Sequence, residues 1–286
     1  NVPTTYVPDD NFEQALIDLG YDDVLDNYVV TDSINSVTYL NVYNDSISDL
    51  TGIEAFTALD TLVCGFNQLT ELDVSNNTAL TQMSIGGNQL TSLDVSSNTA
   101  LTYLDCHLNQ ITSLDLSSNT ALTSLSCRHN ALTELDVSSN TALTLLNGYG
   151  NQLTSLDLSN NTALTYLTCN NNQLTYLNMK NGVTDALTTF NATNNVSLEC
   201  IETLDPDYAT ENWTYDNGNI DEGVFFSESC TALISVSPSE LSEQLFEGDS
   251  STQVLTISND GNIDLEWNIG SFGRDGDVVL YEGIEY

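Results

Sequence analysis

The sequence predicts an α/β-type solenoid dominated by parallel β-strands, in which about eight rungs of 21 residues stack on one another. Two observations support this prediction. A leucine opens each repeat unit and returns every 21 residues, at Leu59, Leu80, Leu101, Leu122, Leu143 and Leu164. Within each unit, apolar and polar residues alternate for a few positions, which is typical of a short strand. Identical strands at a fixed spacing can stack in parallel and bury a continuous core.

Each unit begins with leucines, a cysteine and an asparagine at fixed spacings. The pattern L-x-x-L-x-C-x-x-N-x-L spans residues 101–111, and copies of it lie before and after that stretch. Over roughly residues 37–198 this pattern closely resembles that of the leucine-rich repeat family, in a short bacterial form. The resemblance implies a leucine-rich repeat solenoid with a helical cap at its N-terminal end and a cap at its C-terminal end.

One asparagine recurs in six units, and we expect it to lie inside the turn. There its amide can bond backbone groups of adjacent rungs. These residues are Asn67, Asn88, Asn109, Asn130, Asn151 and Asn172. In the second half of each unit we expect turns and extended or 3₁₀ segments, and two further core columns. The leucine column is Leu72, Leu93, Leu114, Leu135 and Leu156, and the alanine column is Ala79, Ala100, Ala121, Ala142 and Ala163.

Threonines and aspartates also recur in the second half of each unit. Side chains of these types cap tight turns by bonding their own backbone, and we expect that role here. One alternative is calcium held between rungs by the stacked carboxylates; another is a threonine array that orders water. The aspartate column is Asp73, Asp94, Asp115, Asp136 and Asp157.

Residues 1–36 are predicted to form the N-terminal cap, with a helix over residues 9–19. Asp9 or Asp10 can cap this helix, and Gly20 can end it. Its apolar face would contain Phe12, Leu16 and Leu19. The later stretch 47–54 looks like the first repeat of internalin-like proteins.

Residues 199–232 are predicted to form the C-terminal cap, because the repeat pattern stops after Leu198. This segment is similar to the C-terminal caps of secreted leucine-rich repeat proteins of Bacteroidetes. The resemblance implies a disulfide between Cys200 and Cys230. Such a bond would close a loop of about 30 residues and contribute about 3 kcal/mol.

Residues 233–286 resemble the opening hairpins of an immunoglobulin-like domain, as a partial β-sandwich. We expect one strand around 254–257, a turn at 259–262 and a second strand at 265–269. Because a complete sandwich needs about 100 residues, we expect either that the domain continues in a longer protein or that another chain completes the sheet.

Composition excludes several classes of partner. The chain has 41 acidic residues and three basic ones, Arg128, Lys180 and Arg274, which gives a formal net charge of −38. Nucleic acids and anionic lipid surfaces need Lys and Arg, so neither is expected as a partner. No run of 18 apolar residues exists, and no membrane insertion is expected. Such a charge is tolerated where salt screens repulsion, as in seawater.

The outward strand positions vary from rung to rung, and rare residue types gather there. Both histidines and Arg128 fall on neighbouring rungs, with tyrosines around them. Tyr and Arg are favoured in binding hot spots. Gly65, Gly86 and Gly87 would leave a depression beside them. The candidate ligand-binding residues on this expected concave face are Tyr103, Asp105, His107, Leu108, Arg128, His129, Tyr149 and Tyr166. A generic polar face with chance aromatics is the alternative.

The remaining cysteines, Cys64, Cys106, Cys127 and Cys169, share one inward column. We expect buried free thiols that act as small apolar residues, although a bond between Cys106 and Cys127 is conceivable. On the outward strand positions, Asp105, His107 and His129 are types of side chain that can bind a metal or act as acid and base. Because no nucleophile or metal-spaced motif accompanies them, we expect no enzyme and no cofactor, apart from the calcium alternative.

Together these features predict a secreted or cell-surface binding module of a marine Gram-negative bacterium, which recognises a protein or glycan. The alternative is a structural or adhesin subunit of an extracellular assembly, in which the tail pairs with another chain. Self-association through the tail would follow, because an open sheet edge accepts a partner strand.

Overall fold

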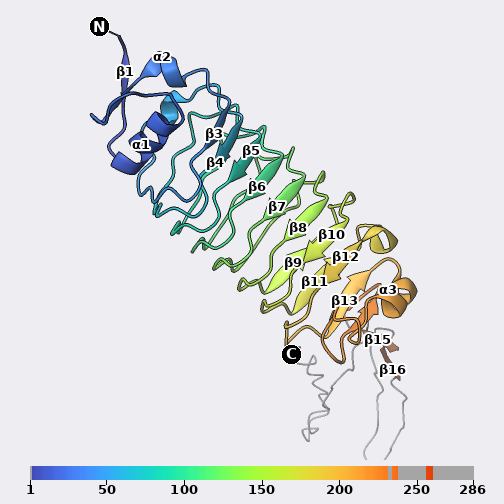
Figure 1. Cartoon of the computed structure of the whole chain (residues 1–286). Coiled ribbons are helices and arrows are strands. Elements are labelled where there is room, and N and C mark those ends of the chain that lie inside the picture. The colour runs from blue at the N-terminus through green and yellow to red at the C-terminus, as the bar shows by residue number, and fades with distance from the viewer. Residues whose placement is uncertain (1, 231–233, 238–255, 260–286) are drawn as a thin grey trace, which may run out of the picture. The chain divides into compact units, whose positions relative to one another are not determined.

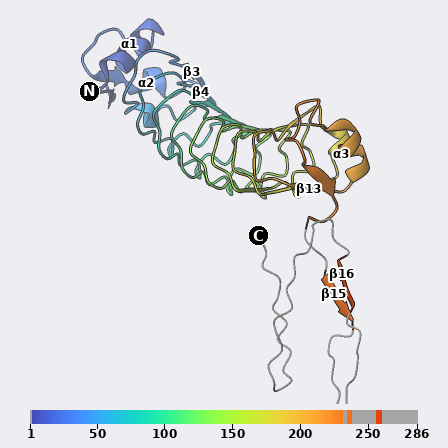
Figure 2. The same cartoon turned by 90° about the horizontal axis from the view of Figure 1, so that it is seen from below.

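The computed structural model describes residues 2–230, 234–237 and 256–259. The chain divides into two compact units, residues 1–226 and 227–286. The first unit is a solenoid whose rungs follow one another from helix α1 (Asp10–Asp18) to helix α3 (Pro206–Asn212) (Figures 1 and 2).

The main sheet has eight parallel strands in the order β12-β10-β8-β7-β6-β5-β4-β3. Neighbouring strands pair equivalent residues of successive units, as in Leu104 with Leu125. The strands are β3 (Tyr39–Asn41), β4 (Thr61–Val63), β5 (Gln82–Ser84), β6 (Tyr103–Asp105), β7 (Ser124–Ser126), β8 (Leu145–Asn147), β10 (Tyr166–Thr168) and β12 (Thr189–Asn191). The predicted solenoid, its rung spacing and its number of rungs are confirmed.

A second sheet forms near the C-terminal end from the second half-repeats of two rungs and two strands of the C-terminal cap. It contains β14 (Phe225–Ser227), β13 (Cys200–Thr203), β11 (Tyr176–Met179) and β9 (Ser155–Asp157), in that order. Two 3₁₀ turns, η1 (Ile53–Ala55) and η2 (Thr184–Ala186), lie at the two ends of the repeat region. The described rungs between these turns contain no helix, as expected for so short a repeat.

The predicted asparagine column is a hydrogen-bonded ladder inside the solenoid. Asn88 Nδ2 donates to the Cys64 carbonyl at 3.1 Å and to the Ile85 carbonyl at 2.9 Å. Its Oδ1 accepts a hydrogen bond from the Leu69 N–H at 3.0 Å. Each such amide therefore joins two rungs through backbone groups that would otherwise be buried without partners.

A second asparagine column, which we did not predict, takes the inward place that we assigned to alanine. In the turn of each second half-repeat, the Leu101 N–H bonds the Asn98 carbonyl at 3.1 Å. This turn directs asparagine inward and leaves Thr99 and Ala100 toward solvent. The alanine column is exposed, with Ala142 half-buried, so its assignment to the core is wrong. The buried asparagines are Asn77, Asn98, Asn119, Asn140 and Asn161.

The other predicted core column of the second half-repeat is confirmed. Leu93, Leu114, Leu135 and Leu156 are buried, and Leu72 is half-buried against the core. A further apolar column beside it completes the packing; it consists of Val74, Val95, Leu116, Val137 and Leu158.

The N-terminal cap begins with a hairpin of β1 (Thr4–Tyr6) and β2 (Tyr28–Val30), followed by α2 (Thr31–Ile34). Asp9 is the N-cap of α1, where its Oδ1 accepts hydrogen bonds from the Asn11 and Phe12 N–H groups. Phe12 and Leu16 are buried, whereas Leu19 is 44% exposed. Leu19 therefore does not belong to the apolar face, because it follows the last helical turn as the C-cap.

The C-terminal cap covers the last rung with β13, α3 and β14. The predicted Cys200–Cys230 disulfide is present. Trp213 stacks on Phe190 with ring centroids 4.2 Å apart, and both side chains are buried. The stacked side chains of Phe190 and Trp213 thus cover the end of the core. The disulfide links Cys200 of β13 to Cys230.

In the second unit, the described residues form an antiparallel pair, β15 (Ile234–Ser237) and β16 (Thr256–Asn259). The strand predicted around 254–257 is found two residues later. Most of the turn predicted at 259–262 and the strand predicted at 265–269 lie outside the described residues. The immunoglobulin-like assignment therefore stays a prediction.

Candidate binding face of the solenoid

The strand face is the outward surface of the main sheet. It consists, in each of the eight rungs, of the residues equivalent to Tyr103, Asp105, His107 and Leu108. Its positions are 39, 41, 43, 44, 61, 63, 65, 66, 82, 84, 86, 87, 103, 105, 107, 108, 124, 126, 128, 129, 145, 147, 149, 150, 166, 168, 170, 171, 189, 191, 193 and 194. All eight predicted site residues lie on it.

The structure brings some predicted residues together and separates others. The rings of His129 and Tyr149 meet edge to face, with centroids 4.5 Å apart. Tyr103 and Tyr166 occupy the same column three strands apart, with Ser124 and Leu145 between them. The predicted residues are therefore spread over several rungs rather than gathered in one cluster.

Asp105 and His107 form the one charge-assisted contact of the strand face. The His107 ring Nδ1 lies 2.8 Å from Asp105 Oδ1, and the His107 backbone N–H also donates to that oxygen at 3.3 Å. Burial, together with the Asp105 carboxylate, raises the pKa of Tyr103. The Tyr103 phenol therefore stays neutral and able to donate at physiological pH.

Arg128 has no carboxylate partner among the described residues. Ion pairs within 4.0 Å there join Asp105 to His107 and Lys180 to Glu202, the latter at 3.1 Å. Arg128 is half-buried, between the rungs of His107 and Tyr149. Its guanidinium donors are therefore not engaged by a carboxylate of the described residues.

The glycines expected to leave a depression are covered by aromatic rings. The His107 ring lies against Gly86, where a Cβ would overlap it, and the Phe66 ring lies 3.0 Å from the Cβ position of Gly87. Phe66 joins Tyr43 and His107 at centroid distances of 5.4 and 5.9 Å. The aromatic rings of Tyr43, Phe66 and His107 thus pack over the glycines. The predicted depression is filled by these rings.

One column of the strand face has a left-handed backbone in every rung. The φ angles are 62° at Asn44, 56° at Phe66, 72° at Gly87, 51° at Leu108, 55° at His129, 68° at Gly150, 54° at Asn171 and 57° at Asn194. The fold therefore constrains the backbone of this column, although the residue types in it vary from rung to rung. Glycine and asparagine adopt this conformation readily, whereas Phe66, Leu108 and His129 each cost about 1–2 kcal/mol.

Phe66 is a candidate site residue that sequence reasoning missed. It is 43% exposed, close to the 42% of Leu108. The available signal was its place in a column that otherwise contains mainly Gly and Asn. Strained residues that persist in an exposed position are candidates for a functional role.

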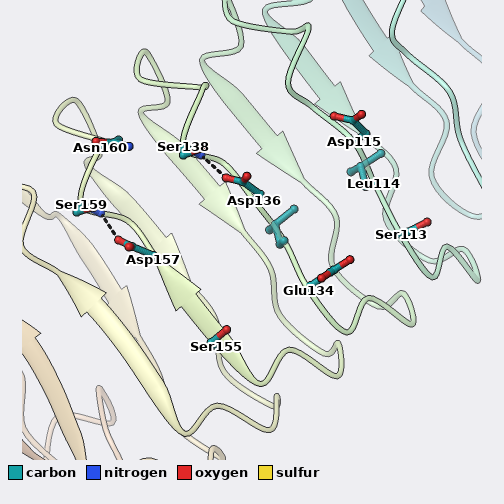
Figure 3. Close-up of a pocket in the computed structure, with 11 residues that line it drawn as sticks. Ser113, Leu114, Asp115, Glu134, Asp136, Ser138, Ser155, Asp157, Ser159 and Asn160 are labelled. Atoms are coloured by element: carbon teal, nitrogen blue, oxygen red, sulfur yellow. Dashed lines mark hydrogen bonds between the residues drawn. The ribbon is translucent and has the colours of Figure 1, made fainter. Parts of the chain in front are cut away.

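The aspartate column on the far side of each rung caps its own turns. In Figure 3, Asp136 and Asp157 accept hydrogen bonds from the N–H groups of Ser138 and Ser159, each at 2.9 Å. Hydrogen bonds from serine also lower the pKa values of Asp73, Asp94, Asp115 and Asp136. A hollow of about 620 Å³ lies between these turns, bordered by Asp115, Glu134 and Asp157 among others.

No group of three or more acidic, histidine or cysteine side chains in the described part of the chain could hold a metal ion. The turn-capping role of the aspartates accounts for their repetition. Calcium between rungs, the alternative for this column, receives no support from the positions of the carboxylates.

The four cysteines of the inward column, Cys64, Cys106, Cys127 and Cys169, are buried and free, as predicted. No bond therefore joins Cys106 to Cys127. Burial raises the pKa of Cys64, Cys127 and Cys169 to about 12. Thiols with such values stay protonated, and their role is packing.

The parallel register, the buried leucines and the asparagine ladder define the class of the protein: the chain folds as a leucine-rich repeat solenoid. Its similarity is to internalins of Listeria monocytogenes. Internalin J of serotype 4b strain F2365 is 39% identical over 73 residues, which cover 26% of this chain and 8% of that protein. This chain thus matches a small part of the length of that curated relative. No family model matches this chain.

One solved structure supports the same fold. The crystal structure of internalin C2 from Listeria monocytogenes strain 4b F2365 matches with a TM-score of 0.62 at 20% identity, over 78% of this chain and 95% of that one. The functional domain of InlJ from Listeria monocytogenes, which includes a cysteine ladder, is 31% identical, with a TM-score of 0.42 over 70% of this chain and 57% of that one. In the described residues, no helix is both long and apolar enough to cross a membrane.

Proposed function

We propose that the protein is a non-catalytic recognition module that binds a protein or a glycan through the strand face. The observation that carries this proposal is a row of strained residues on the strand face, in which Phe66 and Leu108 are exposed and His129 is half-buried. Beside them lies Arg128, which has no ion pair among the described residues. The left-handed backbone of these three residues costs free energy. A surface that keeps costly side chains exposed is best explained by contact with a ligand.

We also propose that the module acts outside the cytoplasm, in the secreted or cell-surface fraction. The Cys200–Cys230 disulfide supports this location, because such bonds persist in oxidising compartments. The similarity to internalins is consistent with it. Fractionation of the producing cells tests the location, and recovery of the protein only from the cytoplasm would contradict it.

Binding of the full chain to protein and glycan arrays tests the recognition function. The test variants are Arg128→Ala and Tyr149→Ala on the strand face. Glu134→Ala is the matched control, because Glu134 is exposed on the far side of the rung that carries Arg128. We expect both test variants to lose at least tenfold in affinity for every ligand that the wild type retains, and the control to lose none. Wild-type affinity in both strand-face variants would remove this face as the site.

A structural role is the second candidate, and the strand pair β15–β16 motivates it. Among the described residues these two strands pair only with each other, and an isolated antiparallel pair is marginally stable in water. The second unit therefore gains stability if further strands join the sheet. Light scattering of the intact chain decides between the roles. Concentration-dependent oligomers support an assembly subunit, whereas a strict monomer at all concentrations excludes it.

A further inference from the structure

We infer that the strand face binds a protein partner that places one carboxylate against Arg128 within an otherwise uncharged contact surface. This inference rests on the proposed function of the strand face and goes further, because it names the class of partner and the group that the partner presents.

The first support is the state of Arg128. In a chain of formal charge −38, a carboxylate neighbour for a cation is easy to find, and Lys180 has one in Glu202 at 3.1 Å. Arg128 has none within 4.0 Å among the described residues. A guanidinium binds a carboxylate through two parallel hydrogen bonds when both planes are free. Arg128 therefore offers a forked donor that nothing on its own face occupies.

The second support is the charge of the face. Of the 32 strand-face positions, Asp105 is the single acidic one, although the chain has 41 acidic residues. That carboxylate is already engaged by His107 at 2.8 Å. Depletion of Asp, Glu and Lys, together with aromatic residues and Arg, is typical of the centre of a protein–protein interface.

The third support is composition, which favours a protein over a glycan. The strand face has five tyrosines, three serines, four glycines and seven asparagines. Five of these glycines and asparagines belong to the left-handed column, where the backbone also favours them. The same four residue types dominate antibody paratopes, with Arg added at hot spots. Tyr gives rigid contact area, and Ser, Gly and Asn give adaptable hydrogen bonds to backbone and side chains.

The charge of the whole chain limits the partner further. A strongly acidic protein would be repelled by the 41 acidic residues, most of which lie off the strand face. A local carboxylate in a neutral surface avoids this repulsion, because exposed charges more than about 8 Å away are screened at physiological salt. The fit is therefore to one Asp or Glu side chain surrounded by uncharged residues.

The test is a side-chain NMR titration of the isotope-labelled chain of 286 residues. The sequence contains two arginines, Arg128 and Arg274, so the guanidinium Nε–H region holds two signals and Arg274 is an internal control. The probes are an end-blocked tyrosyl-glutamate dipeptide, its tyrosyl-glutamine analogue and methyl glucuronide. The glutamine analogue has the same shape without the charge.

We expect the glutamate dipeptide to shift the Arg128 signal saturably. The affinity of the glutamine dipeptide should be lower by a factor of about ten or more. Arg128→Gln should abolish the difference between the two dipeptides. Arg128→Lys should reduce it, because a point charge lacks the fork. Equal melting temperatures of wild type and variants would confirm that both variants fold.

Three results would overturn the inference. Equal, non-saturating shifts of Arg128 and Arg274 would mean unspecific ion pairing. Tighter binding of methyl glucuronide than of the glutamate dipeptide would make the partner a glycan. If the two dipeptides bind equally well and Tyr149→Ala abolishes both interactions, the partner's carboxylate is excluded as the group that Arg128 recognises. The proposed function of the face would then remain intact.

Discussion

Asp105 Oδ1 lies 2.8 Å from Nδ1 of His107, and the His107 ring in turn rests against Gly86 of the preceding rung. One carboxylate thus holds one ring over a position where only glycine fits. The same ring contacts Phe66 at a centroid distance of 5.9 Å. The pair therefore orders the aromatic row on the N-terminal half of the strand face.

Gly86→Ala should disrupt this arrangement. The new Cβ would overlap the His107 ring, and overpacking of this kind costs about 1–3 kcal/mol. We expect a lower free energy of unfolding in urea and weaker binding through the strand face. Gly148→Ala is the control, because a Cβ there meets its nearest neighbours at an ordinary 3.8 Å. If both variants unfold alike, the ring does not depend on the glycine.

Leu108→Asn should stabilise the protein while weakening its binding. Leu108 has φ 51°, a conformation that asparagine adopts more readily than leucine. We expect a gain of about 1 kcal/mol in the free energy of unfolding. The reverse substitution, Asn171→Leu, should lose a similar amount, because Asn171 has φ 54° in the same column. A stabilised Leu108→Asn variant that binds as the wild type does would show that the strain serves no ligand.

Asn119→Ala should be among the most destabilising single changes in the chain. Its amide donates to the carbonyls of Val95 at 3.0 Å and Asn98 at 2.9 Å, and all three groups are buried. Removing the donor leaves two buried carbonyls without this partner, at a total cost of about 3 kcal/mol. The exposed neighbour is the control: Ser118→Ala should change stability by less than about 0.5 kcal/mol. Similar urea midpoints for the two variants would show that the second asparagine column does not stabilise the fold.

Acid should weaken the attachment of the N-terminal cap at Asp9. Burial raises the pKa of this carboxyl, but hydrogen bonds from Ser48, Phe12 and Asp49 more than offset the rise, so the net shift is downward from 3.8. A lowered pKa gives stability that is present above the unfolded value and is lost as pH falls through the folded value. The difference in melting temperature between wild type and Asp9→Ala should therefore be largest near neutral pH and shrink below about pH 4. A difference that stays constant from pH 7 to pH 3 would contradict this assignment.

The sequence predicted the features of the fold that depend on apolar spacing and failed where backbone geometry decides. The leucine columns, the first asparagine ladder and the cap helix follow from periodicity and capping residues. The alanine column was misplaced, because a repeated small residue fits a turn corner as well as a core, and only the turn geometry separates the two. Asn98 and its equivalents were overlooked for the same reason.

The candidate site was predicted in part. Arg128 and the histidines were found because they are rare in this chain, and rarity needs no structure to be seen. The aromatic row was not found, because Phe66 meets His107 across an intervening rung of glycines. The left-handed column was missed as well, although its glycines and asparagines carried the signal.

The most direct test of the central claim is tyrosine footprinting of a complex with an array-identified ligand. Covalent labelling of Tyr103, Tyr149 and Tyr166 on the strand face is compared with that of Tyr215, which is 58% exposed in the C-terminal cap. We predict that the ligand protects the first three residues and leaves Tyr215 labelled as in the free protein. Unchanged labelling of all three strand-face tyrosines in a saturated complex would contradict the account.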